Sequence, residues 1–337
     1  MTRRELMAAT AGPVTIDTEL LQAAGKVTVR VDPNCKQATM VVSTRDTEGT
    51  SAEAVQRATL TQNRDGVLSA KVSGPSNGGT TISGNGIVIN GRGGGMTIGN
   101  ISGGSISTGR NGIQISGYNG PITVNGVQIN GNGSGVNVTP AASPIEITAV
   151  VPPGSALSAR TQSADIEADG LSTVDARTQS GDVSVDAAWT VRADSQSGDV
   201  SVDWVQDLDA KTQSGDIRIG WAQGQVNAKS QSGDVQIQQF AGGSAQANSM
   251  SGNARVHVTA PHGDGPRIVR ASSMSGNATI TAENAQVEQN LNAQATSMTG
   301  RASSPRPAAA RPLHQNDGSR QYNQAMPGRS ANNSRGY

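Results

Sequence analysis

The sequence predicts an all-β protein: a single-stranded, β-helix-like β-solenoid with parallel stacked rungs, a strand-rich N-terminal region and a disordered C-terminal tail. The first observation is a repeated decapeptide. "RTQSGDVSVD" (177–186) returns as "DSQSGDVSVD" (194–203), "KTQSGDIRIG" (211–220) and "KSQSGDVQIQ" (229–238). The second is composition, because aromatic residues make up only 2% of 337 residues while glycine numbers 42. So few large side chains predict a thin core, which suits strands of Val, Ile, Ala, Ser and Thr.

Changes in composition divide the chain into five segments. They are a flexible N-terminus (1–13), an N-terminal β-strand region or cap (14–73), a Gly-rich short-strand segment (74–143), the β-solenoid repeats (144–300) and a tail rich in Arg, Pro and Asn (301–337). The tail carries six Arg against one Asp and has almost nothing to bury, which predicts disorder.

The N-terminal β-strand region contains four stretches in which apolar and polar residues alternate, the period of a half-buried strand. They are "VTIDTEL" (14–20), "KVTVRV" (26–31), "ATMVVST" (38–44) and "VLSAKV" (67–72). Turn residues separate these stretches, and "SAEAVQRA" (51–58) predicts one short helix.

The Gly-rich segment has two interpretations. Residues 74–135 hold 20 glycines, so a flexible linker is the first. However, short apolar pairs recur through it, as in "IVI" (87–89), "IQI" (113–115), "ITV" (122–124) and "VQI" (127–129). Because linkers rarely place β-branched pairs so regularly, we favour narrow β-rungs or hairpins with glycine turns.

Each repeat contains two short strands joined by a turn. In "VDARTQSGDVSV" (174–185), Val174 and Ala176 alternate with polar residues, Gly181–Asp182 turns the chain, and a second alternating strand follows. Glycine is expected at this turn because it takes backbone angles that other residues avoid. A unit of this size cannot bury its own apolar face, but copies stacked about 4.8 Å apart can do so.

Aligning eight copies gives positions that are expected to lie directly above one another. One position is always alanine: Ala159, Ala176, Ala193, Ala210, Ala228, Ala247, Ala271 and Ala295. The separations are 17, 17, 17, 18, 19, 24 and 24 residues. The other predicted structural positions are the serines Ser180, Ser197 and Ser214, the glycines Gly181, Gly198, Gly215 and Gly233, and the aspartates Asp182, Asp199, Asp216 and Asp234.

Polar residues that recur once per copy predict columns on the surface. A glutamine column, expected to hydrogen-bond through its amides, comprises Gln162, Gln179, Gln196, Gln213 and Gln231. A basic column comprises Arg160, Arg177, Lys211 and Lys229. In the last three copies Met250, Met274 and Met298 replace the glutamine, while Asn253 and Asn277 replace the turn aspartate. This joint change indicates contact between neighbouring copies and relieves repulsion among stacked aspartates.

The segment "VVPPGSALSARTQSADIEADG" (150–170), followed by recurring "QSGDV" units, resembles the putative-adhesin family of bacterial β-strand-repeat proteins. The resemblance covers about residues 26–300 and is strongest over 145–300. It implies a β-helix-like solenoid, and it carries no catalytic residues to transfer. The long Gly-rich segment and the Arg/Pro tail depart from the family pattern.

Three tryptophans are the candidate ligand-binding residues. Trp204 and Trp221 occupy matching places after the second strand of their copies, and Trp189 and Phe240 lie close to the same register. An outward-facing row of aromatic rings would stack on sugar rings. An inward-facing row would fill a corner of the solenoid, and the scarcity of other bulky residues favours this second interpretation.

Other chemical signals are weaker. The aspartate column offers the oxygen ligands that Ca²⁺ prefers, but without closely packed Gly-Gly-x-Gly-x-Asp units we expect solvated turn aspartates, no metal site and no cofactor. His257, His262 and His314 fall in no zinc-binding or triad spacing, and Cys35 is interpreted as an ordinary turn cysteine.

These observations predict a non-enzymatic structural or adhesin-like β-solenoid that acts as a scaffold or interaction surface. A carbohydrate-binding module using the Trp row is the alternative. A polysaccharide lyase or hydrolase is less favoured, because it needs one cleft of acids and bases that interrupts the period. The predicted partners are a protein or glycan surface, or further copies joined through the solenoid ends. The sparse basic tail predicts no specific nucleic-acid binding.

The lengths of the apolar stretches in the sequence bear on the cellular location of the protein. No run approaches the roughly 18 apolar residues of a membrane helix, so no transmembrane segment is expected. No apolar stretch follows the basic residues of "MTRRELMAATAGPV" (1–14), so no signal peptide is expected either. The sequence therefore predicts a cytoplasmic protein, whereas an adhesin role predicts the cell surface or the extracellular space.

Overall fold

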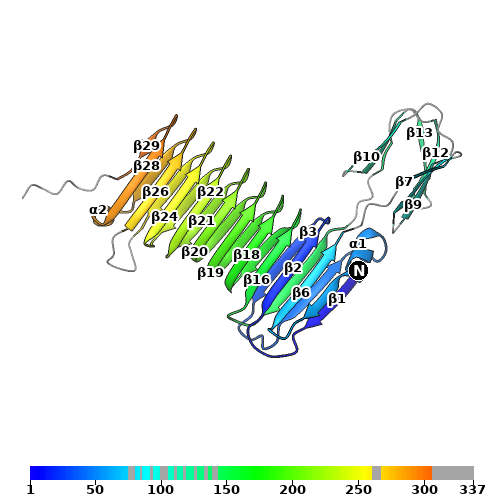
Figure 1. The fold of residues 1–337 in the computed structure, drawn as a ribbon, viewed down its shortest axis with the longest axis horizontal. Coiled ribbons are helices and arrows are strands. Elements are labelled where there is room, and N and C mark those ends of the chain that lie inside the picture. Colours follow the sequence, from blue (N-terminus) through cyan, green and yellow to red (C-terminus); the bar gives the residue numbers. More distant parts are fainter. Residues whose placement is uncertain are drawn as a thin grey trace, which may run out of the picture.

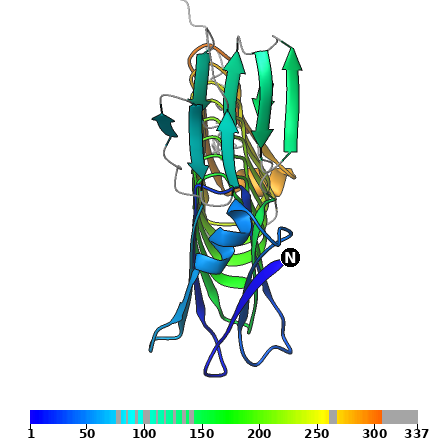
Figure 2. The same ribbon diagram turned by 90° about the vertical axis from the view of Figure 1, so that its right-hand side faces the viewer.

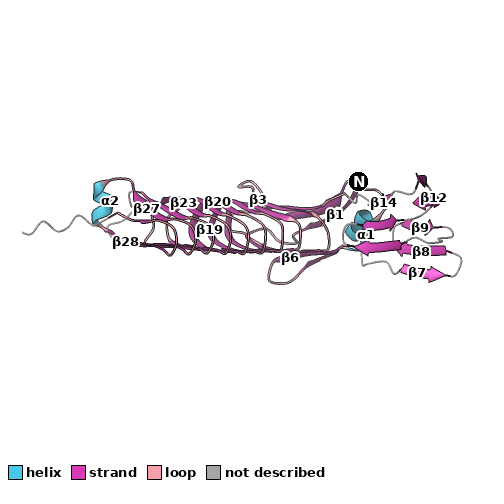
Figure 3. Ribbon diagram, turned by 90° about the horizontal axis from the view of Figure 1, so that it is seen from above, coloured by secondary structure: helices cyan, strands magenta, loops and turns pink. Residues whose placement is uncertain are grey.

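The computed structural model describes residues 1–74, 143–259 and 267–305 in full and only the backbone of the strands within 80–138. Its main feature is one 21-stranded sheet, confirming an all-β protein. The strands of this sheet lie side by side in a long series (Figure 1). Seen from above, they form two layers, with β27, β23 and β3 in one and β28 and β6 in the other (Figure 3).

Hydrogen-bond pairing defines the first layer, called here the first stack. In order it contains β5 (Thr59–Gln62), β6 (Val67–Ser73), β2 (Thr15–Leu21), β16 (Ala156–Thr161), β18 (Leu171–Thr178), the second halves of β19 (Val183–Ser195) and β20 (Val200–Thr212), β22 (Gln225–Ser230), β24 (Ser244–Ser249), β26 (Arg267–Ser273) and β28 (Leu291–Ser297). All neighbours in this stack are parallel except β5 and β6.

The other layer is the second stack. In order it contains β1 (Thr2–Met7), β4 (Thr39–Thr44), β15 (Ile145–Val151), β3 (Gly25–Val31), β17 (Asp165–Asp169), the first halves of β19 and β20, β21 (Ile217–Ala222), β23 (Val235–Phe240), β25 (Ala254–Val258), β27 (Ala278–Ala282) and β29 (Ala302–Ser303). One strand from each stack, with the turn that joins them, makes one rung.

The predicted register of the repeats is confirmed. Ala176 pairs with Ala193, Ala193 pairs with Ala210, and the same alanine column continues through every copy from Ala159 to Ala295. Alanines of the column are completely buried as far as Ala271, and only the last is partly exposed. The 24-residue copies keep this register because their additional residues lie between strands.

Glycine recurs at the turn of successive copies, but for a different reason from the one predicted. None of the repeat glycines has a positive φ angle; the glycines that do are elsewhere, for example Gly154 and Gly170. Instead, the backbones of successive turns lie too close for a side chain. A Cβ on Gly181 would lie 2.0 Å from the carbonyl oxygen of Ala164, and one on Gly215 would lie 2.0 Å from that of Gly198. Close stacking therefore requires glycine here.

The N-terminal β-strand region is continuous with the repeats rather than a separate cap. Strand β2 lies between β6 and β16 in the first stack, and β3 lies between β15 and β17 in the second. In Figure 1 the dark blue β2 accordingly adjoins β16 of the repeats. Of the elements described in full, β1, β4, β5 and helix α1 (Thr50–Arg57) lie beyond the parallel series, at the end shown in Figure 2.

The Gly-rich segment is an insertion into one of these turns. β2 and β3 are joined directly by residues 22–24, whereas their parallel neighbours β6 and β15 are joined by residues 74–144. At the root of the insertion, the Gly74 N–H donates to Leu21 (2.7 Å) and the Ile145 N–H donates to Ala24 (3.0 Å). Sequence position alone would have placed this segment between two domains.

Short strands occupy parts of the insertion, in agreement with the favoured interpretation of hairpins. They are β7 (Thr80–Ser83), β8 (Gly86–Gly91), β9 (Gly94–Ile98), β10 (Ser105–Gly109), β11 (Gly112–Ser116), β12 (Asn119–Val124), β13 (Val127–Asn132) and β14 (Val136–Val138). They pair in an antiparallel manner.

Both ends of the chain differ from the prediction, and the C-terminal end extends beyond the described residues. The flexible N-terminus predicted for 1–13 is wrong for β1, which pairs in an antiparallel manner with β4 because that strand offers an open edge. Near the other end, helix α2 (Ala285–Gln289) starts at Asn284, whose side chain accepts two backbone N–H groups. The tail predicted to be disordered begins at residue 301, and this prediction is wrong for β29 (Ala302–Ser303), which pairs with β27 because that strand offers an open edge. Residues 306–337 of the tail lie outside the described residues.

We predict that Gly215→Ala destabilises the fold by about 1–3 kcal/mol, because the new Cβ would overlap the carbonyl oxygen of Gly198. Gly243→Ala is the matched control, since a Cβ there meets nothing within 4 Å. Urea unfolding followed by circular dichroism measures both. Equal midpoints for the two variants would contradict close stacking as the reason for glycine.

Candidate functional site

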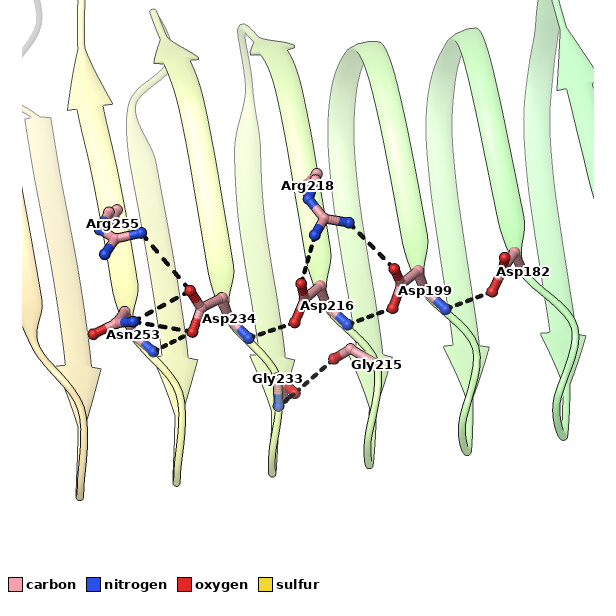
Figure 4. A network of polar contacts seen from close by, with 10 residues as sticks. Asp182, Asp199, Gly215, Asp216, Arg218, Gly233, Asp234, Asn253 and Arg255 are labelled. Atoms are coloured by element: carbon pink, nitrogen blue, oxygen red, sulfur yellow. Dashed lines mark hydrogen bonds and ion pairs between the residues drawn. The ribbon is translucent and has the colours of Figure 1, made fainter.

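The turn aspartates form a ladder of hydrogen bonds between rungs. The Asp182 carboxylate accepts the backbone N–H of Asp199 (2.8 Å), and the Asp199 carboxylate accepts that of Asp216 (2.8 Å). The series begins at Asp165 and runs through Asp234 into the asparagine copies. Figure 4 shows its part from Asp182 to Asn253. The aspartates were expected to be solvated side chains that repel one another. Each of them also satisfies a backbone group of the next rung.

This ladder explains why asparagine replaces aspartate in the later copies. The N–H of Asn277 donates to Oδ1 of Asn253 (2.9 Å), so an amide oxygen serves as well as a carboxylate. Arginines moderate the charge of the aspartate copies. Arg218 bridges Asp199 (3.2 Å) and Asp216 (2.6 Å) across two rungs, at half-exposed positions where such pairs add little stability.

A second ladder, which the sequence analysis missed, is buried at the same turns. The Ser230 hydroxyl donates to the carbonyl oxygen of Gly215 in the preceding rung (2.9 Å) and accepts the N–H of Gly233 (2.8 Å). Its column, at most 7% exposed as far as Ser273, comprises Thr161, Thr178, Ser195, Thr212, Ser230, Ser249, Ser273 and the more exposed Ser297. The signal was present in the sequence, because every copy has Ser or Thr three residues before its turn glycine or alanine.

The glutamine column connects rungs through its backbone. The Ser197 N–H donates to the carbonyl oxygen of Gln179, and the Ser214 N–H donates to that of Gln196, both at 2.9 Å. The predicted structural serines therefore act through their main chains, while their side chains are exposed. Among these glutamines, the Gln162 side chain accepts the Gln22 N–H at 2.9 Å, which joins the first repeat to the β2–β3 turn.

The structure brings the three tryptophans together at one corner, but not in one column. Trp204 and Trp221 are paired in register and partly buried, whereas Ala187, not Trp189, occupies their column in the preceding rung. Trp189 is 62% exposed and meets Trp204 edge to face, with ring centroids 5.6 Å apart. Phe240, predicted close to this register, is fully buried in the next column and fills the corner itself.

An open groove of about 710 Å³ follows the outer edge of the first stack. Its lining includes Arg177, Lys211 and Lys229 from the basic column and Met250 and Met274 beyond it. The basic column is interrupted, because Asp194 lies in register between Arg177 and Lys211. The groove therefore has mixed charge and runs across several rungs.

Acidic residues gather on the outer face of the second stack. Burial, followed by the charges of Asp169 and Asp203, raises the pKa of Asp186 above its usual value. Because its raised pKa favours the protonated form in the folded state, the contribution of this one carboxyl to stability is present at low pH and is lost as the pH rises through its raised pKa. Among the described residues, no group of three or more His, Cys, Asp or Glu side chains is arranged to hold a metal ion.

The remaining candidates are separated from one another. His257 Nδ1 lies 2.8 Å from the Thr281 hydroxyl, and the Cys35 thiol donates to the carbonyl oxygen of Gln37 at 3.0 Å. His262 and His314 lie outside the described residues. In the part of the chain that the structure describes, no helix is long and apolar enough to cross a membrane.

Residues 99–306, more than half of the chain, match the family Toastrack DUF4097. The chain belongs to the Toastrack DUF4097 family. This agrees with the resemblance to adhesin-like repeat proteins that the "QSGDV" units indicated. No curated protein matches the chain.

Three solved structures resemble this Toastrack chain at low identity. A "putative lipid binding protein" from Parabacteroides distasonis is 12% identical, with 90% of this chain and 97% of that chain covered and a TM-score of 0.41. A "putative adhesin" from Bacteroides fragilis is 11% identical over 89% and 95% of the two chains, with a TM-score of 0.31. A "putative cell adhesion protein" from Clostridium sporogenes is 8% identical over 89% and 97%, with a TM-score of 0.23. We draw no functional conclusion from similarity at this level.

We predict that the aspartate ladder of the Toastrack rungs depends on an acceptor oxygen and not on charge. Asp182→Asn keeps an oxygen opposite the Asp199 N–H and should change the free energy of unfolding by less than about 0.5 kcal/mol. Asp182→Ala removes the acceptor and should cost about 1 kcal/mol. Urea unfolding of both variants checks this, and equal losses would contradict the ladder.

Proposed function

We propose that this Toastrack chain is a non-enzymatic β-solenoid that acts as a rigid, adhesin-like scaffold and presents its outer faces to a partner surface. The observation that carries the proposal is the unbroken register of the alanine column. Since core positions remain aligned from rung to rung, outward-facing side chains also recur at a fixed spacing of about 4.8 Å. A surface of this kind suits contact with another extended or repetitive surface.

The use of the polar side chains supports a structural role over a lyase or hydrolase. Catalysis requires acids, bases and nucleophiles that converge once and face the substrate. In the rungs, the turn aspartates accept backbone N–H groups, and the buried serine and threonine hydroxyls link glycine backbones. These repeated residues are therefore engaged in holding one rung to the next.

The two ends of the stack bear on the predicted self-association. Strand β1 carries Arg3 and Arg4 along the antiparallel end, and charged edge strands resist further pairing. At the other end, β28 exposes the uncharged residues Asn292, Gln294 and Thr296. If copies of the chain join, this difference favours pairing at the β28 end. Self-association itself stays a prediction.

We predict that beads coated with the full chain adhere to cells of the species that produces it, more than beads coated with albumin do. The adhesin-like function requires the protein to reach the cell surface or the extracellular space. A scaffold that acts inside the cell would instead be found in the cytoplasm. Counting retained beads after washing measures adhesion. A triple variant of the groove, Arg177→Ala, Lys211→Ala and Lys229→Ala, tests the first stack as the contact face.

The outcomes separate the proposals. Loss of adhesion in the triple variant, with an unchanged circular dichroism spectrum, assigns contact to the first stack. Unchanged adhesion assigns it to another face of the scaffold. Retention of wild-type beads no better than that of albumin beads would contradict the adhesin-like function.

Carbohydrate binding at the Trp corner is a second candidate, favoured by the exposure of Trp189 and its edge contact with Trp204. Aromatic faces at such a corner suit contact with the apolar faces of sugar rings. We predict that a glycan-array signal, if it arises here, is lost in Trp189→Ala and weakened in Trp221→Ala, whose ring is more buried. Phe240→Leu is the control for corner packing, because that ring is fully buried. A signal unchanged by both tryptophan substitutions rules out the corner.

A further inference from the structure

A row of exposed methionines lies along the turn edge of the last three rungs. Met250, Met274 and Met298 are 48%, 45% and 77% exposed. The N–H of Met274 donates to the carbonyl oxygen of Ser249, and that of Met298 donates to Ser273, both at 3.3 Å. The three methionines therefore occupy the same place in consecutive rungs.

The rung spacing brings their sulfur atoms within reach of one point. Neighbouring strands in a sheet lie about 4.8 Å apart, which sets the distance between successive backbones in this row. Methionine has an unbranched side chain with three rotatable bonds and a polarizable thioether. The sulfurs of Met250 and Met298 can therefore lean toward that of Met274 without any movement of the backbone.

The basic column ends before the methionine rungs. Two residues before the column of Gln and Met, the earlier rungs carry Arg or Lys, except at Asp194. In the methionine rungs this position holds the neutral residues Asn248, Ser272 and Thr296. Within the methionine rungs this column therefore places no Lys or Arg beside a bound cation, and its nearest Lys is Lys229, which pairs with Asn248 from the rung before.

The carboxylates of the turn also end at these rungs. After Asp234, the column continues with Asn253, Asn277 and Arg301. Hard cations such as Ca²⁺ and Mg²⁺ prefer carboxylate and carbonyl oxygens, and this change removes the carboxylates from the column. The remaining exposed donors of the row are thioethers, and Met250 and Met274 line the open groove.

We propose that Met250, Met274 and Met298 bind one soft monovalent metal ion, Cu(I), through their three thioether sulfurs. Soft thioether ligands select Cu(I), whereas oxygen ligands select Mg²⁺ and Ca²⁺. The site is independent of the scaffold function, because it requires only three stacked rungs and an open turn edge.

The test uses the full chain with Cys35→Ser, which removes the one thiol of the sequence. Cu(I) is titrated under anaerobic, reducing conditions against a coloured Cu(I) chelator. Ag(I), which is redox-stable, serves as the probe for NMR of methionine methyl groups. We expect one Cu(I) per chain and shifts of three methionine methyl signals on addition of Ag(I).

Replacement by glutamine, the residue of the earlier rungs at this position, removes sulfur while keeping a side chain that the fold accepts. Met274→Gln should weaken Cu(I) binding by about tenfold or more, and the triple Met→Gln variant should abolish it. Met7→Gln, at an exposed methionine on β1, is the matched control and should leave binding unchanged.

A gain of binding provides an independent check. Gln231 precedes Met250 in the same column, since the Met250 N–H donates to Ser230 and the Ser251 N–H donates to Gln231. Gln231→Met would extend the row by one thioether and should tighten binding. Absence of Cu(I) binding in the Cys35→Ser chain, or binding that survives the triple substitution, would overturn the proposal.

Discussion

The structure depends on the close approach of successive turns, where the backbone of one rung lies directly on the backbone of the next. A Cβ on any turn glycine from Gly181 to Gly300 would lie about 2 Å from a carbonyl oxygen of the rung before it. At this separation, main-chain and side-chain groups of adjacent rungs satisfy one another. The aspartate ladder covers the outside of the turn and the hydroxyl ladder covers its buried side. Each rung thus supplies the polar partners that the next rung needs.

This constraint also explains the thin core. The alanine column is completely buried from Ala159 to Ala271, and Val or Leu occupies most positions of the column two residues earlier. Because every rung has its own pair of inward-facing strands, the core grows by repetition rather than by adding large side chains. The composition of the chain, with 2% aromatic residues, is what such a core requires. Among the described residues, the Phe and Trp rings gather at the corner, where Phe240 lies inside and Trp189 outside.

Much of the repeat region could be predicted because residues that pair with one another recur at regular intervals along the sequence. The spacing of the alanines gave the register from Ala159 to Ala295 without knowledge of any other contact. The placement of β2 and β3 within the stacks could not be derived in this way. Those strands pair with β16 and β17 across more than 130 residues, and no shared motif marks the partners. The insertion of residues 74–144 into a turn was hidden for the same reason.

The candidate surfaces were less predictable than the fold. The turn glycine was identified correctly, but its backbone conformation is ordinary, and the steric reason emerges only when two rungs are placed together. The three tryptophans meet at a corner, but a shift of two residues takes Trp189 out of the column and exposes it. The Gln-to-Met change was visible in the sequence, whereas the exposure of all three methionines required coordinates.

The most direct test of rung-on-rung stacking is to delete one whole rung. Removing residues 179–195, which are 17 residues, joins Thr178 to Gln196 and brings the next copy into the same register. The account predicts a folded β-protein with a cooperative urea transition, slightly less stable than the parent chain. Removing only residues 179–187 should instead disrupt the fold, since it leaves half a rung. If both deletions unfold the protein, or both are tolerated equally, stacking in register is not what holds this chain together.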